Sequence, residues 1–194
     1  MLIVVEGIDG TGKSTQVRLL GEALSAKGFE VVVDKEPTDG PIGKKLRDSA
    51  VTGRLSAGEE LALFHEDRRQ HVEEVIAPAL ARGAFVVLDR YYFSTMAYQG
   101  IRGFDPQEIR RENEGFAPVP DLVIVMDLPV DEALRRIGGR DGAGNEFETR
   151  EFLESCDEVF RALEDDFVVR VDASGGVEEV HQLVMEVVEG FLHR

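Results

Sequence analysis

Short apolar runs recur along the chain, separated by longer segments with helical spacing. The runs are rich in Val and Ile, do not alternate with polar residues, and span Leu2–Val5, Phe29–Val33, Ala84–Leu88, Leu122–Met126 and Phe167–Val171. This pattern is typical of strands that are buried on both faces of a parallel sheet. The sequence therefore predicts five buried parallel strands.

Helical periodicity fills most of the segments between these runs. Helices are predicted over Lys13–Lys27, Ser56–Arg82, Val130–Ile137, Glu148–Leu163 and Val177–Leu192. Gly28 and Gly83 suit the position just past a helix C-terminus, and Ser56 with Glu59 forms a capping-box pair. Pro78 is expected to kink the last turns of the second helix. Strand–helix alternation of this kind predicts a doubly wound, five-stranded parallel α/β sheet with right-handed crossovers.

A glycine-rich segment, Gly138–Asn145, separates two predicted helices and contains four glycines. Two interpretations stay open on this segment alone. It can be an ordinary surface loop, or it can be a short mobile lid, over approximately residues 136–148, that closes on a ligand.

The turn after the first strand carries a phosphate-binding motif. The pattern G-x-x-x-x-G-K-[ST] is matched by Gly7-Ile8-Asp9-Gly10-Thr11-Gly12-Lys13-Ser14, with Thr15 following in the helix. Glycines let backbone N–H groups converge on phosphate oxygens, and the helix N-terminus adds partial positive charge. Lys13 can reach between the β- and γ-phosphates, and the Ser14 hydroxyl can bind Mg²⁺. The motif predicts a three-layer P-loop NTPase fold that binds a nucleoside triphosphate.

The nucleotide is predicted to be ATP. A GTPase needs an N-K-x-D motif to recognise guanine, but the two asparagines of the chain, Asn113 and Asn145, are each followed by Glu. ATP is therefore the expected phosphoryl donor.

Three arginines are candidates for binding a phosphorylated acceptor, because a planar guanidinium binds phosphate with two hydrogen bonds. Arg90 follows the third strand, at the edge where doubly wound sheets bind ligands. Arg68 lies four residues after Phe64, so both project from one helix face. Arg47 follows the Glu36-Pro37 turn. From spacing alone, Phe64 also fits the core, and Arg68 also fits a solvated ion pair.

In the motifs that it carries, the chain resembles the thymidylate kinases. The resemblance covers nearly the whole chain in the family's order and spacing. Its motifs are Glu6 through Gln16, Glu36-Pro37 with Gly43 and Arg47, Leu63-Phe64, Asp67-Arg68, Asp89-Arg90-Tyr91, Ser94, Ala97-Tyr98-Gln99-Gly100, Pro120-Asp121 and Asp127-Leu128-Pro129.

The resemblance implies transfer of the γ-phosphoryl group of ATP to thymidine 5′-monophosphate, dependence on Mg²⁺, a homodimer, and a lid that closes over ATP. Lys13, Arg90 and Asp9 become the catalytic candidates, and Asp89 is expected to contact the metal through water. The substrate-binding positions that it implies are Asp9, Glu36, Pro37, Arg47, Phe64, Arg68, Arg90, Ser94, Thr95, Tyr98 and Gln99.

Several of these positions have an implied role. Phe64 is expected to stack on the thymine ring and Arg68 to hydrogen-bond its edge. Arg90, with Arg47 nearby, is expected to hold the acceptor phosphate. Tyr98 is expected to pack on the deoxyribose and exclude a 2′-hydroxyl, with Asp9 near the sugar and the metal-bound waters.

The chain departs from the family pattern at three places. Gly10 follows Asp9 where some members have a basic residue, so the transition-state arginine is expected in the lid, as Arg140 first and Arg136 second. The lid of the family ends in an Asp-Arg pair before an acid, but this chain has Glu146 in place of the cation. Thr95 stands where many relatives have Asn.

Composition narrows the function further. The chain has 194 residues, 43% of them hydrophobic, and a formal net charge of −16. Such an acidic chain lacks the basic surface of a nucleic-acid-coating protein, but a local phosphate pocket is compatible with it. The single cysteine, Cys156, excludes intramolecular disulfides and is expected to pack in a helix. No apolar segment is long enough to span a membrane, and no basic leader precedes the first strand, so a cytoplasmic location is expected.

These observations predict a single P-loop kinase domain over residues 1–194 that phosphorylates thymidine 5′-monophosphate with ATP. Two alternatives stay open. The acceptor can be another nucleoside monophosphate, or, given Glu146, the chain can be a nucleotide-binding regulatory protein with little turnover.

Overall fold

The computed structural model describes residues 1–52, 55–141 and 149–193, and for residues 50–52 and 139–141 the backbone alone. The strands are β1 (Leu2–Glu6), β2 (Val31–Lys35), β3 (Phe85–Asp89), β4 (Leu122–Asp127) and β5 (Val168–Asp172). The helices are α1 (Lys13–Ala26), α2 (Pro41–Thr52), α3 (Ala57–His71), the π-helical segment η1 (Val72–Ile76), α4 (Ala77–Ala81), α5 (Tyr92–Gly100), α6 (Pro106–Glu114), α7 (Val130–Asp141), α8 (Arg150–Arg161) and α9 (Val177–Leu192).

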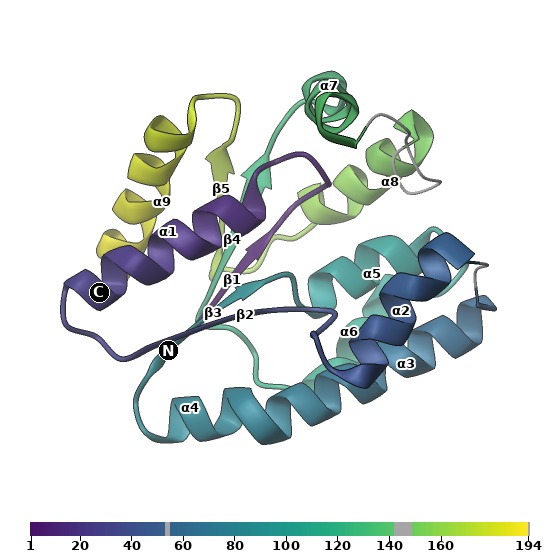
Figure 1. Ribbon diagram of the computed structural model, residues 1–194, viewed down its shortest axis with the longest axis horizontal. Coiled ribbons are helices and arrows are strands. Elements are labelled where there is room, and N and C mark those ends of the chain that lie inside the picture. Colours follow the sequence, from purple (N-terminus) through teal and green to yellow (C-terminus); the bar gives the residue numbers. More distant parts are fainter. Residues whose placement is uncertain (53–54, 142–148, 194) are drawn as a thin grey trace.

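The strands form one parallel sheet in the order β2-β3-β1-β4-β5. Helices α1 and α9 lie side by side on one side of the sheet, and the long α3–η1–α4 helix runs along the opposite side (Figure 1). The three-layer, doubly wound fold predicted from the sequence is confirmed. Because β1 leads to α1 on one side and β3 leads back on the other, the carboxyl ends of β1 and β3 flank the switch point where such sheets bind ligands.

Burial separates the central strands from the edge strands. The side chains of β1, β3 and β4 are almost wholly buried, as predicted. The prediction of full burial is wrong for β2 and β5, which are partly exposed; Val33 in β2 is 47% exposed. Both are edge strands with one neighbour each. β2 also begins two residues later than predicted, because Phe29 lies outside the strand and packs its ring on Phe85 at 4.7 Å.

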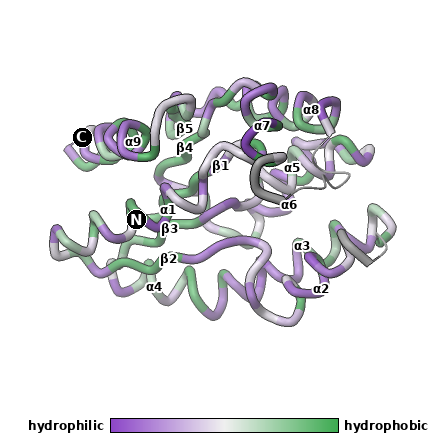
Figure 2. The backbone as a smooth tube through the Cα atoms, turned by 45° about the horizontal axis from the view of Figure 1, so that its top comes forward, coloured by the Kyte–Doolittle hydropathy of each residue, from purple (hydrophilic) through white to green (hydrophobic). Residues whose placement is uncertain are grey.

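The predicted helices are present with adjusted ends. Ser56 and Glu59 form the predicted capping box, and the π-helical turn of η1 lies just before Pro78, where the helix was expected to be irregular. Figure 2 shows alternating hydrophobic and hydrophilic bands along α9, whose Val180, Val184 and Val188 face the core. Cys156 is buried in α8, as predicted.

One helix end was predicted wrongly. The helix expected to end at Ile137 continues as α7 through Gly138 to Asp141, so the first four residues of the predicted loop are helical. The rest of the predicted lid, with Glu146, lies outside the described residues. Three helices, α2, α5 and α6, were not predicted.

Within the described ranges, no helix is both long and apolar enough to cross a bilayer.

Candidate functional site: a P-loop beside a second nucleotide-sized cavity

The P-loop connects β1 to α1 in the conformation that its glycines require. Gly7 and Gly10 have φ of 134° and 87°, which L side chains rarely adopt. A Cβ at Gly7 would come within 2.7 Å of the Met126 carbonyl oxygen, and one at Gly10 within 2.6 Å of the Ala133 carbonyl oxygen. The loop therefore packs directly on the backbone of β4, at Met126, and of α7, at Ala133, and this packing holds its shape.

Lys13, at the first position of α1, lies folded back over the loop. Its Nζ donates to the Ile8 carbonyl at 2.7 Å, and the side chain is buried. Burial and the positive charge of Arg90 lower the pKa of Lys13 to about 8, although Asp9, Asp89 and Glu6 oppose this. The Lys13 ammonium is thus held at the loop, where the nearby carboxylates only partly offset the effects of its burial and of the Arg90 charge.

Ser14 and Asp89 meet across the P-loop, where the Ser14 hydroxyl donates to Asp89 Oδ2. Asp89 Oδ1 is buried and has no hydrogen-bond partner in the described part of the chain. A hydroxyl and a carboxylate with unused acceptor capacity are the hard oxygen ligands that Mg²⁺ prefers alongside phosphates and water. No group of three or more His, Cys, Asp or Glu suited to a metal occurs among the described residues. The pair therefore fits a Mg²⁺ that takes its other ligands from a nucleotide.

Arg90 lies between the P-loop and the second half of the site. It has a left-handed backbone (φ 71°) in the turn between β3 and α5, uncommon for a residue other than glycine. Its guanidinium donates to Asp9 Oδ1 at 2.6 Å, Ser94 Oγ at 2.9 Å and the Gly7 carbonyl at 3.4 Å. These contacts fix the guanidinium beside the phosphate loop.

Asp9 joins Arg90 to Tyr98, whose hydroxyl donates to Asp9 Oδ2 at 2.8 Å. Burial would raise the pKa of Asp9, but Arg90, Lys13 and the Tyr98 hydrogen bond outweigh it and hold the pKa at about 2. Asp9 is therefore a carboxylate at neutral pH, suited to orienting its partners and unsuited to carrying a proton.

A side chain from β1 holds the N-terminus of helix α5. Glu6, the last residue of β1, accepts from the Tyr91 N–H at 2.8 Å, the Ser94 N–H at 3.1 Å and the Ser94 hydroxyl at 2.6 Å. These bonds satisfy N–H groups that a helix N-terminus leaves free. Burial raises the pKa of Glu6, against the opposing effect of Arg90 and these hydrogen bonds. Glu6 thereby sets where α5 begins relative to the P-loop.

A cavity of about 260 Å³ opens between α3, α5 and the turn after β2. All eleven residues predicted to bind the acceptor line it, and three others, Leu46, Glu60 and Tyr91, complete the lining. Asp9 and Arg90 belong to both the cavity and the surroundings of the P-loop. The predicted acceptor residues, which span positions 9 to 99, are thus brought together next to the triphosphate motif.

Helix α3 contributes one face to this cavity. Glu60, Phe64 and Arg68, four residues apart, all line it, as the predicted shared face of Phe64 and Arg68 implied. Arg68 is 1% exposed, so the alternative of a solvated ion pair is wrong. Phe64 is half-buried and borders the cavity, which distinguishes it from the sealed core.

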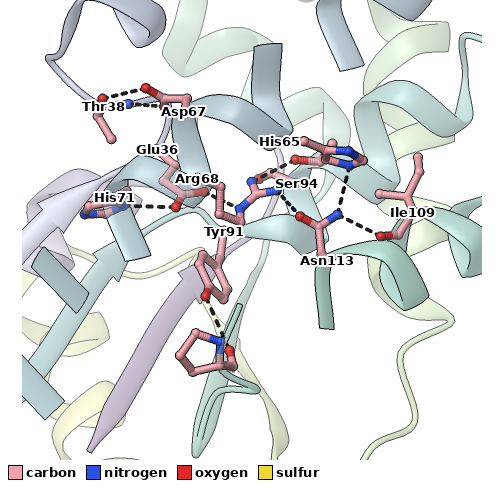
Figure 3. A network of polar contacts seen from close by, with 12 residues as sticks. Glu36, Thr38, His65, Asp67, Arg68, His71, Tyr91, Ser94, Ile109 and Asn113 are labelled. Carbon is pink, nitrogen blue, oxygen red and sulfur yellow. Dashed lines mark hydrogen bonds and ion pairs between the residues drawn. The ribbon is translucent and has the colours of Figure 1, made fainter. Parts of the chain in front are cut away.

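Arg68 is held on three sides by buried groups (Figure 3). Its Nε donates to Glu36 Oε2 at 2.7 Å, Nη1 to Asn113 Oδ1 at 2.6 Å, and Nη2 to Thr95 Oγ1 at 3.0 Å. The guanidinium also lies over the Tyr91 ring, 5.3 Å from its centroid. Each Nη carries one further N–H that has no hydrogen-bond partner among the described residues. Arg68 is therefore a donor of fixed orientation.

His71, one helical turn beyond Arg68, contacts the other oxygen of Glu36. Its Nδ1 lies 3.0 Å from Glu36 Oε1 (Figure 3). Its Nε2 lies 3.3 Å from Asp34 Oδ2, outside hydrogen-bonding geometry. Burial alone would lower the pKa of His71, but the two carboxylates raise it to about 9. His71 is thus protonated at neutral pH, and it contacts the Glu36 oxygen that Arg68 leaves free.

The turn after β2 is tied to α3 as well. Asp67 accepts from the Thr38 N–H at 2.8 Å and from its hydroxyl at 2.6 Å (Figure 3). Arg47 donates from Nη1 to the Pro37 and Thr38 carbonyls and from Nη2 to Asp39 Oδ1. Arg47 therefore borders the cavity while its guanidinium holds the turn.

The two lid arginines are placed differently from the other candidates. Arg136, on α7, donates to Glu132 Oε1 and to the carbonyls of Ala173 and Ser174, which follow β5. It does not line the acceptor cavity. The side chain of Arg140 lies outside the described residues.

Several important residues were not predicted from the sequence. Glu60 could have been found by extending the Phe64–Arg68 spacing back by one turn. His71 and Asn113 had no such signal, because His71 contacts Glu36, and Asn113 contacts Arg68, across elements distant in sequence.

The P-loop on a parallel sheet of this order, with a second cavity sharing Asp9 and Arg90, places the chain among the P-loop kinases. A model of the thymidylate kinase family matches residues 5–184. A thymidylate kinase of Akkermansia muciniphila is 59% identical over 179 residues, covering 92% of this chain and 86% of that protein. Thymidylate kinases of Xanthomonas euvesicatoria pv. vesicatoria and Xanthomonas oryzae pv. oryzae are 50% and 51% identical over 180 residues, each alignment covering 93% of this chain and 79% of theirs. The chain belongs to the thymidylate kinase family and is an enzyme.

Proposed function

We propose that the protein transfers the γ-phosphoryl group of ATP to thymidine 5′-monophosphate, releasing ADP and thymidine 5′-diphosphate for deoxythymidine triphosphate synthesis. The observation that carries the proposal is the cavity beside the P-loop, whose lining includes all eleven predicted acceptor residues. A nucleotide monophosphate there would direct its phosphate toward Arg90 and the P-loop. Family membership supports the same reaction.

ATP is the proposed donor, bound through the P-loop from Gly7 to Thr15. The backbone N–H groups and Lys13 would hold its phosphates, and Lys13 would leave the Ile8 carbonyl to do so. Ser14 and Asp89 would hold Mg²⁺, Asp89 through water. When bound, Mg²⁺ supplies charge that neutralises the phosphate oxygens during transfer.

The phosphate end of the acceptor is assigned to Arg90. Its guanidinium, oriented by Asp9 and Ser94, would bind the acceptor phosphate and hold an oxygen in line with the γ-phosphorus. That oxygen forms the new P–O bond as the bond to ADP breaks, so no protein nucleophile is required. Arg140, with Arg136 second, is the proposed lid arginine for the transition-state charge.

The base end of the cavity has donors and an acceptor that match an imide edge. Arg68 retains N–H groups for a base carbonyl, and Phe64 offers a face for stacking, worth about 1–3 kcal/mol. Gln99 lines the cavity, and its Oε1 is buried with no partner among the described residues. The N3–H of thymine would satisfy this oxygen, whereas cytosine has a lone pair at N3. Thr95 holds Arg68, where Asn is common in relatives.

Tyr98 is the proposed contact for the sugar. Its ring centroid lies 5.1 Å from the Arg90 guanidinium carbon, and its hydroxyl is bound to Asp9, so the ring is fixed in the cavity wall beside these two residues. In that place it would pack on a deoxyribose and crowd a 2′-hydroxyl. A homodimer, which the resemblance implies, and the cytoplasmic location expected from the sequence complete the proposal.

The test is ADP release with ATP, Mg²⁺ and a panel of monophosphates: TMP, dUMP, UMP, dCMP and dGMP. We expect acceptor-dependent ADP with TMP as the preferred acceptor and dCMP poorly used. Absence of acceptor-dependent ADP with every monophosphate would refute the proposed reaction. Equal rates with TMP and UMP would overturn the thymidylate assignment.

A further inference from the structure

We propose that Glu60 is a specificity-determining residue that fixes the orientation of the Gln99 amide and thereby selects an imide base over an aminopyrimidine. The inference rests on the proposed function. Glu60 lies on α3, one turn before Phe64, and lines the cavity opposite α5. Its side chain is 5% exposed, so its charge acts within the site.

The contact between Glu60 and Gln99 sets the direction of the amide. Gln99 Nε2 donates to Glu60 Oε2 at 2.6 Å. A carboxylate accepts hydrogen bonds and cannot donate them, so a rotated amide would put two acceptor oxygens in contact. Glu60 therefore keeps Nε2 on its own side and leaves Oε1 as the free end of the amide. That end is the buried oxygen without a partner among the described residues.

Glu60 is itself held in place. Arg102 Nη1 donates to the same Glu60 Oε2, and Arg102 Nη2 donates to the Leu55 carbonyl at 3.0 Å. The salt bridge compensates the buried charge, and the second bond ties Arg102 to the residue just before the α3 cap. The orientation of the Gln99 amide, with Oε1 as its unpaired end, is thus set by the Arg102–Glu60 and Glu60–Gln99 contacts before any ligand binds.

This orientation distinguishes bases by the ring nitrogen that faces Gln99 Oε1, which can carry either an N–H donor or a lone pair. A base with N–H at this position gains a hydrogen bond, and one with a lone pair there leaves Gln99 Oε1 unpaired against it. Leaving a buried polar atom unpaired disfavours the wrong base, as when a site built for a hydrogen bond meets an analogue that lacks it. With Glu60 replaced by Gln, the new amide can donate to Gln99 Oε1, and Gln99 can then turn its Nε2 to the ligand.

The experiment measures kcat/KM for TMP and for dCMP in wild type and in Glu60→Gln. We expect the TMP:dCMP ratio to fall about tenfold in the variant, with the change mostly in KM. Glu59→Gln is the matched control, because Glu59 undergoes the same substitution on the exposed side of the same helix, and its ratio should equal that of wild type. A ratio in Glu60→Gln that matches wild type, with both activities lowered equally, would show a merely structural role and overturn the proposal.

Gln99→Leu supplies an independent test that does not depend on the stability of Glu60→Gln. This variant should lower the TMP:dCMP ratio, and adding Glu60→Gln to it should change the ratio no further, because Glu60 acts through Gln99. An unchanged ratio in Gln99→Leu, or an undiminished effect of Glu60→Gln in its background, would refute the mechanism. The wild-type panel separates the two proposals: wild type without TMP turnover refutes the proposed function, whereas TMP turnover with an unshifted ratio in the variants refutes the role of Glu60 alone.

Discussion

His71 should make the stability of the fold depend on pH above neutrality. The substitution that tests this is His71→Gln, which keeps an N–H donor for Glu36 but cannot carry a proton. In the folded chain the pKa of His71 is raised from 6.5 to about 9, because the carboxylates of Asp34 and Glu36 face the imidazole and outweigh the effect of its burial. A raised pKa means that folding and protonation favour each other.

The magnitude follows from the difference between the two pKa values. Each pKa unit corresponds to about 1.4 kcal/mol, so the proton on His71 contributes about 3 kcal/mol to the free energy of unfolding. The contribution is fully present below pH 6.5, where the unfolded chain is protonated too. It declines between pH 6.5 and 9 and is lost above pH 9. His71→Gln should therefore be less stable than wild type by about 3 kcal/mol at pH 6 and by much less at pH 9.5.

The assay is urea unfolding of wild type and variant at pH 6, 7.5 and 9.5. His65→Gln is the matched control on the same helix, because burial and the charges of Arg68 and Arg69 lower the pKa of His65 to about 4. His65 is thus neutral in the folded chain throughout this range. Its substitution should shift stability by a constant amount between pH 7.5 and 9.5, and at pH 6 it removes the small loss of stability that protonation of His65 in the unfolded chain causes. A stability difference between wild type and His71→Gln that stays constant from pH 6 to 9.5 would refute a protonated His71.

Two further predictions concern the phosphate side of the site. Since the pKa of Lys13 in the ligand-free chain is about 8, kcat/KM for ATP should fall as pH rises through about 8. Lys13→Ala should lower turnover by roughly 10²–10³-fold in steady-state assays. Near-normal turnover of this variant would exclude the lysine from the chemistry. Arg90→Lys keeps the positive charge but loses the guanidinium that contacts Asp9, Ser94 and Gly7. We therefore expect kcat/KM for TMP to fall roughly 10–100-fold, while KM for ATP stays near the wild-type value. An equal loss for both substrates would contradict the assignment of Arg90 to the acceptor phosphate.

The layout of the fold could be predicted because its signals are local. Apolar runs, helix caps and the P-loop are each determined within a dozen residues, and all five strands and five of the helices followed from them. The edge position of β2 could not be predicted in this way. The Val31–Lys35 run is as apolar at its start as a central strand, and only the order of the sheet shows that one of its sides has no neighbouring strand.

Helix α5 shows why the rest was missed. Seven of its nine residues are buried, so the segment has no amphipathic stripe. Its start is defined by Glu6, more than eighty residues earlier, in place of a local cap. The same holds for Arg68, whose partners Glu36, Asn113 and Thr95 come from three other elements. A single sequence shows which residue types are present but not which distant pairs meet.

The acidic composition fits a phosphate-binding site because the acids are partners of its cations. Arg90 pairs with Asp9, and Arg68 with Glu36, so neither guanidinium depends on a basic surface to be held in the cavity. A flexible cation would attract any phosphate or carbonyl, whereas a paired one can donate only along its remaining N–H bonds. The carboxylates thus lower the attraction of the cavity for anions in general and raise its selectivity for a ligand with its phosphate and base at the right separation. Selective recognition of one nucleotide therefore requires the acids of this site as much as its arginines.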